Sequence, residues 1–291
     1  MKRRYLTNIV LLIIVILLFW QWRSLSPQVA LPDVIAPEID PDAVKQIRIE
    51  RADKADVNLT RYDDRWQIEA PFNAPANANR IKFLLNIVTT PFSAKFSIHN
   101  QDLATLGLTA PFVRVNLDGA LFSFGDVEPL SGQRYLQYQE DVYVFNDTIS
   151  PLLTANANGL IENHLLFEEP TMTALNLPFR QSDSQLDQQR LTIQASDGTW
   201  QSSTVSASVA SQLGQAWQNA SAIQVNFIDT TSLDASQPIQ FHFSDNTSLA
   251  AFAHLSSQGL RIFIPERRLQ YYFPSRAALA LFPALAPTES D

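Results

Sequence analysis

The stretch VRVNLDGALFSF, residues 113–124, carries the clearest fold signal in the sequence. Apolar and polar residues alternate from Val113 to Leu117, and a second apolar-rich run covers residues 121–124. Asp118 and Gly119 lie between the two runs, and this dipeptide favours the tight turn of a β-hairpin. The sequence therefore predicts an antiparallel hairpin in this part of the chain.

Other short strands and one helix surround this hairpin in the first half of the chain. Strands are predicted at residues 43–51, 57–61, 66–68, 95–98, 134–139 and 142–145. A helix is predicted to begin near Asn79, because four apolar residues follow at the spacing of one helical face. These residues are Ile81, Leu84, Leu85 and Val88.

The second half of the chain repeats this order of elements. Strands are predicted at residues 190–195, 223–227, 239–243, 260–264 and 269–273, with a helical stripe at Val205, Val209, Leu213 and Trp217. Trp200 takes the place that Trp66 has in the first half, and we expect both rings to pack in the core rather than to stack on a ligand. The predicted fold is α+β, with two similar repeats that each combine an antiparallel sheet with one packed helix.

An apolar segment near the N-terminus predicts a membrane anchor. Residues 9–20 are all apolar, and the segment 5–22 would span about 27 Å as a helix, close to the roughly 30 Å of a hydrocarbon core. Three cations at positions 2–4 favour a cytoplasmic N-terminus and a single crossing. A cleaved signal peptide is the alternative, but Trp22 and Arg23 are bulky for a cleavage site.

A proline-rich segment follows the anchor. Its four prolines within residues 24–41 are typical of an extended tether, and an arm lying on the folded part is the alternative. The predicted domains are residues 1–23 (transmembrane signal-anchor), 24–41 (tether), 42–167 (first repeat) and 168–291 (second repeat). Glu168, Glu169 and Pro170 are interpreted as a linker between the repeats rather than as a metal site.

Composition and charge exclude several classes of protein. The chain of 291 residues has no cysteine, which excludes disulfides, cysteine-ligated zinc, iron–sulfur clusters and thiol nucleophiles. Its net charge is −8, and 17 basic and 29 acidic residues remain after residue 23, a net charge of −12. Such an acidic folded part is not expected to bind nucleic acid.

The segment GDVEPLSGQRY, residues 125–135, holds the best candidate for chemistry. Asp126 and Glu128 are two residues apart, and Arg134 is close enough in sequence to pair with one of them. One interpretation is a carboxylate pair for acid–base hydrolysis. The other, which we favour, is a structural loop in which Asp126 bonds backbone amides and Arg134 locks the ends. No nucleophile elbow, nucleotide-binding loop or metal-binding pattern occurs, so no catalytic residue, cofactor or metal ion is expected.

A long uncharged segment lies in the second half. Residues 198–228 include no charged residue in 31 positions, but many Ser, Gln, Asn and Ala. Charge depletion is typical of the centre of a protein–protein interface. A solvated helix would explain the same composition, and both interpretations are kept.

Short motifs occur in a characteristic order over roughly residues 1–167. They are KRRYLTN at 2–8, Arg65-Trp66 with Ala70-Pro71, Leu106-Gly107-Leu108 with Pro111, Phe124-Gly125-Asp126 with Pro129-Leu130, Gly132 and Arg134-Tyr135, and Val142-Tyr143. In these residues the chain resembles the DUF4340 family, an uncharacterised group of bacterial membrane-anchored proteins. Some members resemble accessory subunits encoded with gliding-motility-type ABC exporters. The resemblance implies a role in transport or envelope assembly and implies no catalytic residues.

The sequence thus predicts a non-enzymatic protein of the bacterial inner membrane with its folded part in the periplasm. We expect it to contact the membrane through residues 5–22 and to bind other envelope proteins, including ABC transporter subunits. The alternative is a periplasmic hydrolase that acts on a glycan or peptide through Asp126, Glu128 and Arg134. A third candidate is a binder of lipid or polymer in a groove between the repeats.

Overall fold

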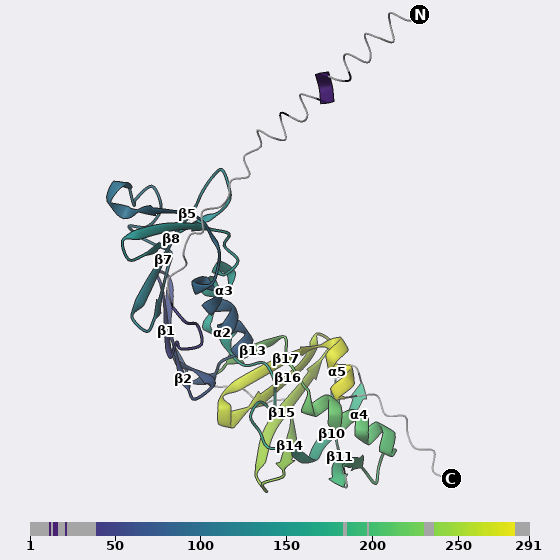
Figure 1. Cartoon of the computed structure of the whole chain (residues 1–291). Helices are drawn as coiled ribbons and strands as arrows, with labels where there is room; N and C mark the ends of the chain where they lie inside the picture. The colour runs from purple at the N-terminus through teal and green to yellow at the C-terminus, as the bar shows by residue number, and fades with distance from the viewer. Residues whose placement is uncertain are drawn as a thin grey trace, which may run out of the picture.

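The computed structural model describes residues 39–182, 185–196, 198–229 and 236–282, together with Leu12, residues 14–16 and Gln21. The chain forms two antiparallel sheets accompanied by a few short helices. Figure 1 shows the two sheets as separate bodies that meet in the middle of the molecule, the first in blue and teal and the second in green and yellow. The prediction of an α+β fold with two antiparallel sheets is confirmed at this level.

The first sheet has nine described strands in the order β4-β3-β2-β1-β6-β7-β8-β9-β5. The strands are β1 (Gln46–Arg51), β2 (Lys54–Tyr62), β3 (Arg65–Ala70), β4 (Ala74–Pro75), β5 (Phe92–Ser97), β6 (Val113–Leu117), β7 (Ala120–Val127), β8 (Arg134–Tyr138) and β9 (Asp141–Phe145). The predicted hairpin is β6–β7, whose register places Leu117 opposite Ala120 and Val113 opposite Phe124.

The second sheet has eight described strands in the order β12-β11-β10-β14-β15-β16-β17-β13. The strands are β10 (Met172–Ser182), β11 (Gln185–Ser196), β12 (Thr199–Gln201), β13 (Gln224–Phe227), β14 (Gln237–Phe243), β15 (Ser248–Ser256), β16 (Gly259–Ile264) and β17 (Leu269–Pro274). Apart from β4, each strand of the first sheet has a counterpart at the same place in the second. The two sheets therefore share one strand order.

The helices also lie at corresponding points of the two halves. They are α2 (Ala78–Leu85), α3 (Ser150–Thr154), α4 (Ala207–Gln218) and α5 (Ser275–Leu281), with the 3-10 turns η1 (Asn86–Val88), η2 (Ile98–Asn100), η3 (Ala157–Leu160) and η4 (Pro265–Arg267). α2 precedes β5 as α4 precedes β13, and α3 follows β9 as α5 follows β17. The prediction of one helix per sheet found α2 and α4 but missed α3 and α5, which are too short to show a helical repeat.

The prediction also missed β10, the first strand of the second sheet. It placed the first strand of that half at residues 190–195, which belong to β11. Leu175 and Leu177 of β10 are buried and alternate with outward-facing residues. Pro178 follows these leucines, and the pairing with β11 shifts register between Pro178 and Arg180. Proline is tolerated in a sheet at such an irregularity.

The core lies between each sheet and its helices. Trp66 and Trp200 are both buried, which confirms that they are core residues. Trp200 packs against Gly214 of α4, where a Cβ atom would lie 2.5 Å from Cδ2 of the ring. Trp217 of the same helix contacts Phe241 edge-on and donates a 3.0 Å hydrogen bond from its indole nitrogen to the carbonyl oxygen of Leu281 at the end of α5.

Apart from Leu12, residues 14–16 and Gln21, the predicted anchor at residues 5–22 lies outside the described residues, as does most of the predicted tether. Among the residues that are described, none belongs to a helix of sufficient length and apolarity for a membrane crossing.

Candidate functional site

The 127–133 loop, which is the last residue of β7 and the connection to β8, is shaped by the carboxylate of Glu128. This carboxylate accepts hydrogen bonds from the backbone amides of Leu130 (3.3 Å) and Ser131 (2.7 Å). The amide of Glu128 donates to the carbonyl oxygen of Gln133 (2.6 Å) and closes the loop. Hydrogen bonds from Ser131 hold the pKa of Glu128 below its usual value. Glu128, rather than Asp126, is therefore the residue that bonds backbone amides.

Arg134 ties the start of β8 to two other segments. Its Nη1 donates a 2.7 Å hydrogen bond to the carbonyl oxygen of Gly125, and its Nε pairs with Oδ2 of Asp147. The guanidinium also lies 4.5 Å from the ring centre of Phe112. The expectation that Arg134 pairs with Asp126 or Glu128 is therefore wrong, although the residue does hold the ends of the loop.

Asp147 is the partner that the sequence did not reveal. Its side chain is only 7% exposed, and its Oδ1 accepts the amides of Ile149 (3.0 Å) and Ser150 (2.9 Å) at the start of α3. Burial opposes ionisation of Asp147, but hydrogen bonds from Ser150 and the ion pair with Arg134 outweigh it and lower the pKa of this carboxyl. A carboxylate 13 residues from its arginine, at the entry to a short helix, gives no recognisable sequence signal.

Asp126 faces a different part of the chain from Glu128. Its amide donates to the carbonyl oxygen of Leu106 (2.8 Å). Its side chain packs against Gly107, where an added Cβ atom would lie 2.5 Å from the Cγ of Asp126. Gly107 has a φ of +68°, so glycine suits this close approach. A general acid in a carboxylate pair needs a raised pKa, whereas that of Glu128 is lowered. The geometry thus favours a structural loop over a catalytic pair.

The same loop presents apolar side chains to solvent. Leu130 is 95% exposed, the most exposed large apolar side chain among the described residues, and Val127 is also exposed. Because the backbone around Leu130 is fixed by Glu128 and Gln133, the leucine is held out by an ordered loop. Such a side chain can be buried by a binding partner without ordering the loop first.

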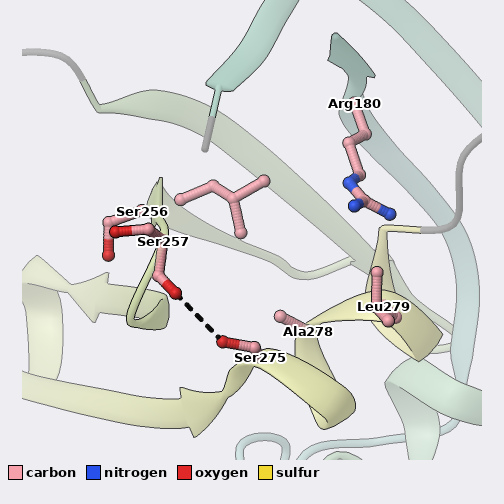
Figure 2. Close-up of a pocket in the computed structure, with 7 residues that line it drawn as sticks. Arg180, Ser256, Ser257, Ser275, Ala278 and Leu279 are labelled. Atoms are coloured by element: carbon pink, nitrogen blue, oxygen red, sulfur yellow. Dashed lines mark hydrogen bonds between the residues drawn. The ribbon is translucent and has the colours of Figure 1, made fainter. Parts of the chain in front are cut away.

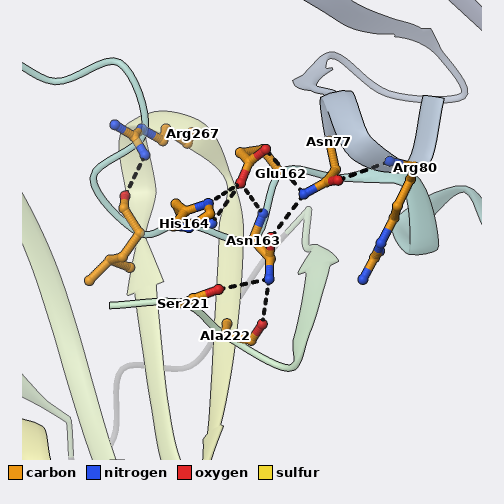
Figure 3. A network of polar contacts seen from close by, with 9 residues as sticks. Asn77, Arg80, Glu162, Asn163, His164, Ser221, Ala222 and Arg267 are labelled. Atoms are coloured by element: carbon orange, nitrogen blue, oxygen red, sulfur yellow. Dashed lines mark hydrogen bonds and ion pairs between the residues drawn. The ribbon is translucent and has the colours of Figure 1, made fainter. Parts of the chain in front are cut away.

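The two halves are joined by a connector, residues 160–165, which bonds to both. In the first half, Ile161 forms an antiparallel bridge with Ala76. In the second, His164 bridges Ser221, and the amide of Leu165 donates to the carbonyl oxygen of Ala220 (2.8 Å). The connector therefore lies like a short strand between the halves, as the close-up in Figure 3 shows.

Glu162, which is 4% exposed, is the centre of this junction. Its Oε1 accepts bonds from the amides of Asn163 and His164 (2.9 Å each) and lies 2.7 Å from Nδ1 of His164. Its Oε2 accepts from Asn77, the N-cap of α2, at 3.2 Å. Asn163 extends the network to Ser221 of the second half through a 2.8 Å bond (Figure 3). The carboxylate of Glu162 thus holds the connector residues Asn163 and His164 and the α2 cap Asn77 in place.

Aromatic stacking and ion pairs complete the junction. Phe72 stacks on Phe227 of β13 at 4.7 Å, and Arg65 pairs with Glu168 at 2.9 Å. Arg267 pairs with Glu169. The two glutamates interpreted as a linker are thus each held by an arginine, and among the described residues no group of acidic and histidine side chains could hold a metal ion. Two residues of the uncharged segment 198–228, Ser221 and Phe227, therefore contact the connector and the first half within the same chain.

A small pocket of about 300 Å³ lies between β15, β10 and α5 of the second half. Figure 2 shows three serines at its rim, with Ser275 donating a 3.3 Å bond to the carbonyl oxygen of Ser257. Arg180, which also lines it, donates to the carbonyl oxygen of Phe282 at 3.5 Å. The arginine therefore links β10 to Phe282, the residue that follows α5.

Comparisons with known proteins give one match. No curated protein and no solved structure is similar to the chain. A family model described as Domain of unknown function (DUF4340) matches residues 66–234, which is more than half of the chain. The matched region covers the 127–133 loop, the connector and the uncharged segment. The chain therefore belongs to the DUF4340 family.

Proposed function

We propose that this protein is a single-pass protein of the bacterial inner membrane whose folded part lies in the periplasm and binds other envelope proteins. Its role is non-enzymatic, and it serves an ABC-type exporter or an envelope-assembly complex. The observation that carries the binding role is Leu130, which is almost fully exposed on a loop with its own hydrogen bonds.

The anchor in this proposal is the segment 5–22. The folded part has a net charge of −12 after residue 23, so anionic lipid headgroups repel it and cannot hold it at the membrane. The apolar segment and the cations at positions 2–4 supply both the attachment and the orientation. Alkaline carbonate extraction tests this: the native chain should stay in the membrane pellet, and the double variant Ile14→Lys with Leu18→Lys should lose that retention.

The folded part, in this proposal, arose by duplication of one α+β unit. Supporting it are the shared strand order of the two sheets and the helices at corresponding points of each half. Trp66 and Trp200 lie on the corresponding strands β3 and β12. The domains are then residues 42–167 and 168–291, and the connector 160–165 lies just before their boundary.

Leu130 is the side chain that a protein partner would bury at the centre of the contact. Burial of a fully exposed leucine is worth roughly 1.5–3 kcal/mol. The fixed loop limits the entropy that binding would otherwise cost. An enzyme site would need a cleft around its ionisable groups. This loop instead exposes Leu130 at its tip, and the carboxylate of Glu128 is already bonded to backbone amides.

Photo-crosslinking in intact membranes tests this proposal. A photoreactive residue at position 130 should yield a discrete adduct with an envelope protein, and one at Ile223, which is exposed on the second half, should not. Leu130→Asp should then reduce co-purification of that partner at least tenfold with an unchanged melting temperature, while Ile223→Asp should leave it intact. Equal losses for both variants, or no adduct at position 130, would sink the idea.

A further inference from the structure

The first sheet ends in β5, at the edge opposite β4. Among the described strands, β9 alone is paired with β5. Figure 1 shows β5 on the side of the first sheet that lies far from the second half. A strand in this position presents unpaired backbone donors and acceptors, to which another extended chain can bond. We call the side of β5 that faces away from β9 the open edge.

The backbone of Ser97 is directed towards the open edge. The amide of the next residue, Ile98, donates to the carbonyl oxygen of Glu140, just before β9 (3.0 Å). Because neighbouring residues of a strand direct their backbone groups to opposite sides, the amide of Ser97 faces away from β9. Lys95 has the same direction, since the register is regular from Ala94 to Ser97. Lys95 and Ser97 therefore each offer an amide and a carbonyl oxygen to a chain alongside β5.

The corresponding edge of the second sheet, at β13, is covered within the chain. Phe227, at the end of β13, directs its amide outward and donates a 3.2 Å hydrogen bond to Oδ1 of Asn158 in η3. The next amide, that of Ile228, bonds inward to the carbonyl oxygen of Arg268 (2.9 Å), which is the alternation inferred for the end of β5. A segment of the first half thus covers the edge of the second sheet, whereas no described segment is bonded to the open edge of the first.

The charge of Lys95 is held away from the open edge. A lysine on an edge strand usually guards the strand against pairing with another chain. The Nζ of Lys95 instead pairs with Oδ2 of Asp141 on β9 (2.8 Å) and lies 5.4 Å from the ring centre of Tyr143 on the same strand. Both contacts draw the ammonium group towards the sheet, so it does not block the backbone groups beside it.

Two apolar side chains lie at the open edge. Ala94 and Phe96 are partly buried, and the register places them beside Val144 and Val142 of β9, which are buried. Alternate residues of a strand share one face of the sheet, so these two side chains extend an apolar row to the last strand. A neighbouring chain would continue the row if it carried apolar side chains at alternate positions.

The open edge begins next to the 127–133 loop. Ser93, near the start of β5, donates a 2.7 Å hydrogen bond from its hydroxyl to Oε1 of Gln133. The carbonyl oxygen of Gln133 accepts the amide of Glu128 and so closes the loop that presents Leu130. Gln133 thus contacts both β5 and the loop, which brings the open edge and Leu130 within reach of one partner.

Building on the proposed function, we propose that the partner that buries Leu130 binds as an extended segment and adds a strand to β5. Its backbone bonds the outward groups of Lys95 and Ser97, and its apolar side chains lie beside Ala94 and Phe96. In this mode of recognition the backbone pairing supplies affinity and the alternate side chains supply specificity. The partner is therefore an extended peptide segment with apolar residues at every second position.

Ser97→Pro tests the backbone pairing. Ser97 has a φ of −74° and a ψ of 144°, which suit proline, so the variant loses the outward amide without backbone strain. Ser97→Ala is the matched control, because it loses the same hydroxyl but keeps the amide. With a photoreactive residue at position 130 in intact membranes, Ser97→Pro should reduce the yield of the partner adduct at least tenfold and Ser97→Ala less than twofold. Both variants should melt at the native temperature.

A peptide probe tests the same pairing on the native chain. The crosslinked segment of the partner is identified by mass spectrometry, synthesised and titrated with the full-length chain in detergent by fluorescence anisotropy. N-methylation of alternate backbone amides should weaken binding at least tenfold in one set, whose amides face β5, and less than twofold in the other. This alternation is the signature of a strand that is paired on one side.

An adduct at position 130 that Ser97→Pro leaves intact would overturn strand addition and still keep Leu130 as the binding residue. Equal effects of the two N-methylated sets would overturn it in favour of a folded partner surface. An adduct between two copies of the chain would assign the open edge to self-association instead. Absence of any adduct at position 130 would overturn strand addition together with the proposed function.

Discussion

The side chain of Arg134 links three segments that are separate in sequence: the carbonyl of Gly125 on β7, the ring of Phe112 before β6 and the carboxylate of Asp147 before α3. Because this ion pair is largely buried, loss of one partner leaves an uncompensated charge. Arg134 directly follows the 127–133 loop that presents Leu130. The orientation of the loop therefore depends on an interaction at its base.

Replacement of Arg134 by methionine, which keeps much of its bulk, should lower the free energy of unfolding by about 3 kcal/mol. Arg48→Met is the matched control, since the Arg48 side chain is 55% exposed and its ion pairs are at the surface. The control should lose less than about 1 kcal/mol. Urea denaturation of the two variants measures both values, and equal losses would contradict a special role for the Arg134–Asp147 pair.

The lowered pKa of Asp147 predicts a pH dependence of stability. A carboxyl whose pKa is lower in the folded state stabilises the fold above its unfolded pKa, and this contribution disappears as the pH falls through the folded-state value. Asp147→Asn should therefore be less stable than the native chain at pH 7, and the difference should shrink as the pH approaches 3. Urea denaturation over this range measures it.

Glu140→Gln is the control for this pH series, because the Glu140 side chain is 80% exposed. Its stability relative to the native chain should hardly change with pH. A constant difference between Asp147→Asn and the native chain down to pH 3 would show that the charge of Asp147 does not stabilise the fold.

Helix α4 packs closely against β12 because Gly214 has no side chain to separate it from the Trp200 ring. Gly214→Ala would raise helix propensity, yet its Cβ would overlap the Trp200 ring, so we expect a loss of about 1–3 kcal/mol. Gln212→Ala on the exposed face of α4 should change stability by less than about 0.5 kcal/mol. Thermal unfolding distinguishes these outcomes, and a stabilised Gly214→Ala would refute the close packing.

Periodicity in the sequence was sufficient for most elements and insufficient for a few. The hairpin β6–β7 and the helix α2 follow alternating and helical spacing, and both are found, although α2 ends at Leu85 and the predicted face continues to Val88 only through η1. β10 was missed because Pro178 normally argues against a strand, and only the bulge beside it makes the proline acceptable. Arg134 was identified as a loop-locking residue, but Asp147 was not, because their pairing depends on how β8 and β9 align.

The carboxylate of Glu162 joins the connector to the first half of the molecule by accepting hydrogen bonds from Asn77, Asn163 and His164. Glu162→Ala would leave the donors of Asn77, Asn163 and His164 without their acceptor, at a cost of about 1–3 kcal/mol. We expect the relative motion of the halves to increase. The chain has no cysteine, so cysteines introduced at Lys82 on α2 and Gln212 on α4 give unique spin-label sites.

The distance distribution between these labels should be narrow in the native chain and clearly broader in Glu162→Ala. Glu140→Ala, which removes an exposed carboxylate far from the connector in sequence, should keep the native width. An unchanged distribution in Glu162→Ala would mean that stacking of Phe72 on Phe227 and the ion pair between Arg65 and Glu168 suffice to fix the halves.

The connector also determines how the molecule responds to force. Tension that enters through one half and leaves through the other stretches residues 160–165, because this segment is continuous with both. Its bridges to Ala76 of the first half and Ser221 of the second half resist that stretching. We therefore expect a displacement imposed on one half to pass through the connector to the other half.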